Sequence, residues 1–139
     1  MANVKYKNFG AAIAKNDMDS VTLKAMFVEP TYTPDTDTEV YLSDISANRA
    51  AGTTDVTLTS FTITVDNTGN FTIFEVADFS TGTITANTNG VVVYISTGVN
   101  TTSELLVRLD LLAEGVPTTF SVVSGVLTAN VNTNGLFTI

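Results

Sequence analysis

Residues 91–112, VVVYISTGVNTTSELLVRLDLL, decide the fold that the sequence predicts. The run at 91–95 is β-branched and aromatic, which suits a buried, pleated surface. Residues 96–103 are small, polar or glycine except for Val99, a composition typical of a turn. From residue 105 to residue 112, apolar residues then recur at every second position, which is the period of a strand. We therefore predict two antiparallel strands that direct five side chains into one core: Val93, Ile95, Leu105, Val107 and Leu109. The alternative is a helix over 103–114, because Leu105, Leu109 and Leu112 also fit helical spacing.

Further strand and turn signals occupy most of the remaining chain. Residues 20–29, 56–66 and 71–76 alternate or are β-rich, and 83–86 predicts a short edge strand. Ser124-Gly125 lies between two apolar runs, which predicts a tight hairpin of 120–123 with 126–131, and a last strand is expected over 136–139. Strands at spacings of roughly 8–12 residues indicate a sandwich or barrel. We expect one mainly β, antiparallel domain over residues 1–139, with one or two short helices near the N-terminus.

Two segments near the N-terminus break the strand pattern. Residues 1–17 predict an arm or short helix, with Tyr6, Phe9, Ala12 and Ile13 on roughly one helical face. Residues 30–46 predict a loop and a short helix inserted after the first strand. Prolines exclude regular structure at the start of this insertion. Thr36 and Glu39 fit a capping box, which predicts a helix from 37 to about 46.

Composition excludes several classes of function. The 139 residues contain no cysteine and no histidine, so disulfides, thiolate metal sites and histidine-assisted nucleophiles are absent. The chain has six basic and fourteen acidic residues, which gives a net charge of −8. Such a chain is poorly suited to nucleic acid or anionic membranes. No apolar run reaches the roughly 20 residues of a membrane span. The N-terminus also lacks a signal-like apolar run, so we expect synthesis and retention in the cytoplasm.

The acidic loop with Asp35, Asp37 and Glu39 is the sharpest candidate site. Alternate acids can offer oxygen ligands to Ca²⁺, but the glycine and distal glutamate of an EF-hand are missing. A solvated loop that caps a helix is the other interpretation, and we expect no metal and no cofactor. The remaining candidate acids lie on apparently unrelated strands and turns: Asp66, Glu75, Asp78, Asp110 and Glu114. We therefore expect no catalysis.

Three parts of the chain are the most recognisable: Tyr32-Thr33-Pro34-Asp35, Tyr41-Leu42-Ser43-Asp44-Ile45, and the hairpin from Val92-Val93-Tyr94 to Leu105-Leu106. With these parts, the order of segments resembles a family of small structural proteins of tailed bacteriophages, the capsid or virion proteins. The resemblance covers most of the chain. These are structural rather than catalytic signatures, and the tryptophan expected before the first strand is absent.

The resemblance implies a capsid decoration, or cement, protein on the exterior of the virion. Such a protein would bind the major capsid protein and itself, as a homo-oligomer that could be a trimer, and would contact neither nucleic acid nor membrane. We expect the interface to use the arm and the acidic loop: Tyr6, Phe9, Ile13, Tyr32, Asp35 and Asp37. A tail or neck component is one alternative. A carbohydrate-binding sandwich module for host adhesion is another, in which Tyr32, Tyr41 and Tyr94 could stack on sugar.

Overall fold

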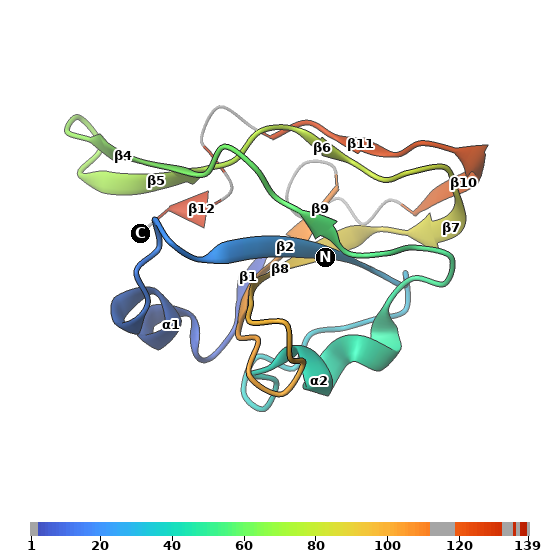
Figure 1. Ribbon diagram of the computed structural model, residues 1–139, viewed down its shortest axis with the longest axis horizontal. Coiled ribbons are helices and arrows are strands. Elements are labelled where there is room, and N and C mark those ends of the chain that lie inside the picture. Colours follow the sequence, from blue (N-terminus) through green and yellow to red (C-terminus); the bar gives the residue numbers. More distant parts are fainter. Residues whose placement is uncertain (1–2, 112–118, 132–134, 136, 139) are drawn as a thin grey trace.

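A five-stranded antiparallel sheet forms the centre of the computed structural model, which describes residues 3–111, 119–131, 135 and 137–138 (Figure 1). Its strand order is β1-β9-β8-β2-β3. The central strands β2 and β8 are apolar on both faces, so both faces of the sheet need a cover. The strands are β1 (Val4–Lys5), β2 (Thr22–Val28), β3 (Val56–Thr57), β8 (Gly90–Ser96) and β9 (Leu105–Asp110).

A second layer of antiparallel strands covers one face of this sheet. It consists of the ribbons β12-β5-β4, β11-β6 and β10-β7, drawn in the upper part of Figure 1. Phe74, Val76 and Phe79 of this layer pack with Phe27 and Val93 in the larger apolar core. Its strands are β4 (Thr62–Asp66), β5 (Phe71–Glu75), β6 (Phe79–Ser80), β7 (Ile84–Thr88), β10 (Phe120–Gly125), β11 (Thr128–Ala129) and β12 (Phe137–Thr138). The arrangement is sandwich-like, which confirms the predicted fold class.

The opposite face of the sheet is covered by residues 30–46 and by Tyr6. The short helix α2 (Leu42–Ile45) buries both of its terminal apolar side chains in a second core. This smaller core contains Tyr6, Met26, Val28, Tyr32, Leu42, Ile45, Val92, Tyr94 and Leu105. The other α-helix, α1 (Phe9–Lys15), lies at one end of the sheet and adds Phe9 and Ala12 to the larger core.

The predicted central hairpin is confirmed, and the helix considered for 103–114 does not form, since β9 is a strand up to Asp110. One predicted side-chain direction is wrong. Val93 pairs with Val107 but Tyr94 pairs with Leu105, so Leu106 is an extra residue that forms a bulge. A bulge shifts the alternation by one residue. Leu105 therefore enters the smaller core with Tyr94, while Val93 and Val107 enter the larger one.

The predicted helix over 37–46 is too long. Helix α2 begins at Leu42 and is followed directly by a 3₁₀ turn, η1 (Ser46–Asn48). The expected Thr36–Glu39 capping box does not form, because the Glu39 carboxylate instead accepts hydrogen bonds from the Tyr32 hydroxyl and the Asp35 N–H. The Asp44 carboxylate caps the start of α2, where it accepts a hydrogen bond from the Tyr41 N–H at 2.8 Å.

Two predicted strand arrangements are also wrong, both at residues with a left-handed backbone. Ser60 has φ 55° and divides the predicted strand 56–66, so that β3 joins the central sheet and β4 joins the covering layer. Ser124 has φ 48° and lies in a bulge of β10 rather than in a hairpin turn. Consequently β10 pairs with β7, and β11 pairs with β6. Of the last predicted strand, Phe137 and Thr138 pair with β5, and the rest lies outside the described residues.

Candidate interaction site

The N-terminal arm packs on its own domain. The side chains of Tyr6 and Phe9 are buried, with 2% and 7% of their surface exposed, and Ile13 is half-buried against the larger core. The Lys5 ammonium group lies 4.9 Å from the centre of the Phe9 ring, over its face. Tyr32, the fourth apolar anchor expected to meet a partner, is only 4% exposed. The domain itself buries Tyr6, Phe9 and Tyr32, which leaves little of their surface for a partner, and their expected place in an interface stays a prediction.

A chain of hydrogen bonds joins the arm to the acidic loop. The hydroxyl oxygens of Tyr6 and Tyr32 are 2.6 Å apart, and the Tyr32 hydroxyl donates to Glu39 Oε2 at 2.7 Å. Because Tyr32 has one hydroxyl proton and gives it to Glu39, Tyr6 must donate to Tyr32. Burial raises the pKa of both tyrosines above the ordinary value of 10. Both hydroxyls thus stay neutral and hold the loop against the sheet.

The acidic loop presents two carboxylates to solvent. Asp35 and Asp37 are exposed, and the Asp37 N–H donates to Asp35 Oδ1 at 3.1 Å. Hydrogen bonds from the Thr38 side chain and the Asp37 backbone lower the pKa of Asp35, so its carboxylate is charged at neutral pH. Within the described residues, no three acidic side chains are grouped closely enough to hold a metal ion. Asp35 and Asp37 are available for contacts outside the chain.

The connection between β8 and β9 holds the start of α2. The N–H of Leu42 donates to the Ser103 carbonyl at 2.8 Å, and the N–H of Ser43 donates to the Asn100 carbonyl at 3.0 Å. Glu104 pairs with the Lys15 ammonium at 2.8 Å, which raises the pKa of that lysine and ties α1 to the same region. Figure 1 shows α1, α2 and the β8–β9 connection on the side of the central sheet away from β4 and β5.

We define the acidic face as Asp35, Asp37, Tyr41 and Asp44, which are exposed side chains of this region. Tyr41 is the aromatic member, with 36% of its surface exposed. The other tyrosines considered for sugar stacking are buried: Tyr32 in the hydrogen-bond chain and Tyr94 against Asp55, to which its hydroxyl donates at 2.6 Å. One exposed ring does not make a sugar platform, so this face does not favour carbohydrate binding.

A buried ionic cluster was missed by the sequence analysis. The alternation placed Arg108 opposite the core-facing side chains, but Arg108 and Asp110 are both fully buried and contact each other. Arg108 Nη2 also donates to Asn89 Oδ1 at 3.1 Å, and its Nε has no partner within the described part of the chain. Residues two apart share one face of a strand, so the Arg-x-Asp spacing was the available signal. The cluster has no exposed side chain and acts inside the fold.

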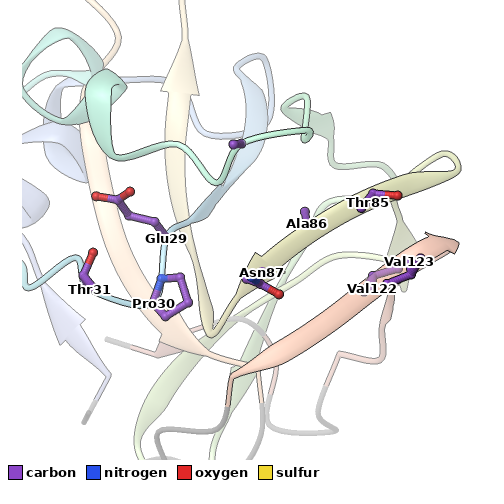
Figure 2. A pocket seen from close by; sticks show the side chains of 9 residues that line it. Glu29, Pro30, Thr31, Thr85, Ala86, Asn87, Val122 and Val123 are labelled. Atoms are coloured by element: carbon purple, nitrogen blue, oxygen red, sulfur yellow. The ribbon is translucent and has the colours of Figure 1, made fainter.

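An open groove of about 560 Å³ lies between residues 29–31 and the β7–β10 ribbon (Figure 2). Figure 2 shows Glu29, Pro30 and Thr31 along one side, with β7 and β10 along the other. Its lining mixes small, polar and apolar side chains: Glu29, Pro30, Thr31, Ala51, Thr85, Ala86, Asn87, Val122 and Val123. Glu29 is the single ionisable group in this lining, so the groove offers no pair of catalytic groups.

The acids considered for catalysis serve the fold or stand apart. Asp66 accepts the N–H groups of Thr68 and Gly69 in the β4–β5 turn, and Asp78 accepts the Val131 N–H at 2.7 Å. Asp110 belongs to the buried cluster, and Glu114 lies outside the described residues. Among the helices that the structure describes, none has the length and apolar character needed to cross a membrane.

Comparison of the chain with protein-family models, curated proteins and solved structures finds no match. The resemblance to phage virion proteins therefore rests on the sequence segments named above.

Proposed function

We propose that this protein is a non-enzymatic structural protein of a bacteriophage virion, a decoration protein that binds the outer surface of the capsid. The observation that carries the proposal is the acidic face, whose loop is fixed to the sheet by the Tyr6–Tyr32–Glu39 hydrogen bonds. A loop that is already ordered loses little conformational entropy on docking. The described residues also lack a convergent set of catalytic groups, which fits a protein that works by binding alone.

Such a protein stabilises a capsid by mass action. Packed DNA presses outward on the shell, and a ligand that binds only the assembled lattice adds its binding free energy to that lattice. The net charge of −8 suits the exterior, since it disfavours contact with DNA inside. The proposed partners are the major capsid protein and further copies of this chain, and the proposed place of synthesis is the host cytoplasm.

The buried arm changes the expected mode of contact. Tyr6 and Tyr32 support the acidic face from behind, and Asp35 and Asp37 make the contact. Charged side chains at an interface rim steer association and fix its register. We therefore expect a basic patch on the capsid surface to receive the two carboxylates, with Tyr41 as the apolar contact beside them.

The test adds purified protein to expanded capsids that lack it and compares two matched variants. Asp35→Asn with Asp37→Asn removes two charges from the acidic face. Asp17→Asn with Asp19→Asn is the control, because the Asp19 N–H donates to Asp17 Oδ1 in the same geometry as Asp37 to Asp35. Both pairs are exposed.

We expect the first pair to weaken capsid binding at least tenfold and the control pair to change it less than twofold. Equal losses of capsid binding from both pairs would show that the effect depends on net charge alone and not on the acidic face. Failure of the unaltered protein to bind capsids, together with binding to tails or glycans, would refute the proposal.

A further inference from the structure

Strand β4 is an unprotected edge of the covering layer. It is the outer strand of the β12-β5-β4 ribbon, and nothing in the described part of the chain pairs with its outer side. An edge strand presents unpaired N–H and C=O groups that can pair with another strand. On β4 the apolar side chains are also exposed, with 40% of Ile63 and 63% of Val65 accessible to solvent.

The other long edges of the described strands are blocked. Strand β10 contains a bulge near Ser124, which interrupts regular pairing. Residue 52 packs closely against β7, since a Cβ on Gly52 would lie 2.4 Å from the Thr85 carbonyl oxygen. Strands β1 and β3 are two residues long each. By contrast β4, with the sequence TITVD, has five residues, no proline and no lysine to prevent pairing.

We propose that β4 pairs in antiparallel fashion with β4 of a second copy of this chain, which joins the two covering layers into one continuous sheet. The register that pairs all five residues is centred on Thr64 opposite Thr64 of the second copy. Side chains opposite each other lie on the same face. This register therefore places Ile63 beside Val65 of the second copy, and Thr62 beside its Asp66.

For self-association, charge favours this edge over the other surfaces of the chain. Two chains of net charge −8 repel each other, so they approach most easily where acidic side chains are fewest. Strand β4 itself has one acid, Asp66 at its end, and the Thr64-centred register opposes it with a neutral threonine. The neighbouring acid, Glu75 of β5, accepts a hydrogen bond from the Thr64 hydroxyl of its own chain at 3.5 Å. Because the same strand is used by both copies, the contact has two-fold symmetry and closes as a dimer rather than growing into a fibre. It does not depend on capsid binding.

A charge exchange at Thr64 tests the pairing. Thr64 is exposed, so Thr64→Lys and Thr64→Glu leave the core unchanged. Each variant alone places two like charges opposite each other, and an equal mixture places lysine opposite glutamate. We expect sedimentation to give a dimer for the unaltered chain at up to about 1 mM, monomers for each variant, and dimers again for the mixture. A monomeric unaltered chain, dimers in both variants, or no recovery in the mixture would overturn the proposal.

Cysteine cross-linking tests the register independently, and the chain has no cysteine of its own. Opposed residues in an antiparallel pair have Cα atoms about 4.5–5.5 Å apart, within the roughly 4.4–6.8 Å that a disulfide spans. Thr64→Cys should therefore form a disulfide-linked dimer on mild oxidation. Thr62→Cys is the matched control, because the two copies of residue 62 would be offset by four residues, about 13 Å. Equal cross-linking of both variants, or of neither, would overturn the register.

Discussion

Removing one hydroxyl from the tyrosine chain should have a cost that depends on its position in the chain. Tyr6 is the terminal donor, and Tyr32 both accepts from Tyr6 and donates to Glu39. Tyr6→Phe removes one hydrogen bond and leaves Tyr32 bonded to Glu39, which should cost about 0.5–1.5 kcal/mol. Tyr32→Phe removes two hydrogen bonds and leaves the buried Tyr6 hydroxyl without a partner. That unsatisfied group adds about 1–3 kcal/mol, so Tyr32→Phe should be clearly the more destabilising change.

Urea denaturation followed by circular dichroism measures both variants. We expect the midpoint to fall more for Tyr32→Phe than for Tyr6→Phe, with unchanged slopes. In the double variant the orphaned hydroxyl is gone, so its cost should be less than the sum of the two single costs. The exposed Tyr41→Phe is the control and should stay within about 0.5 kcal/mol. A Tyr6→Phe cost equal to or above that of Tyr32→Phe would refute the central position of Tyr32 in the hydrogen-bond chain.

Three further outcomes follow from the cores. Leu105 is fully buried, so Leu105→Ala should cost about 2–5 kcal/mol; a loss under half a kcal/mol in a chemical melt would contradict its place in the smaller core. Gly90→Ala should lower the melting temperature, because the added Cβ would lie 2.5 Å from Arg108 Nη2, whereas Gly82→Ala, with open space around it, should not. Stability should also fall as pH rises above 10: the folded state holds the protons of the buried tyrosines, whose pKa is raised, while the unfolded chain releases them. Each such tyrosine contributes about 1.4 kcal/mol per pH unit, and a pH-independent melting temperature between pH 9 and 12 would contradict this.

The elements that the sequence predicts well are those whose pattern is local. The 91–112 hairpin was predictable because two apolar runs are separated by a clear turn, and β2 because its alternation is regular. The bulge at Leu106 was not, since Leu105, Leu106 and Val107 are all apolar and period two cannot locate an insertion within such a run.

The failures at Ser60 and Ser124 have a shared physical cause. Serine is not a residue that favours positive φ, so Ser60 signalled no break in its strand, and the turn signal at Ser124-Gly125 did not reveal that the strand continues through it as a bulge. Similarly, the burial of Tyr6 and Tyr32 was not predictable from their segments, which have the patterns of an arm and a loop. Only the tertiary contact between them, 26 residues apart, allows both hydroxyls to be buried.

The bulge in β9 gives the chain one position at which it can change length without reorganising. Removing Leu106 would leave Leu105 opposite Tyr94 and Val107 opposite Val93, so every remaining side chain would keep its face. Removing Leu105 instead would give the same sequence, whereas removing any other residue of the paired region would exchange the two faces for the residues on one side of the gap. An in-frame deletion of this single codon would cost the packing of one buried leucine, and the hairpin would become a regular ladder.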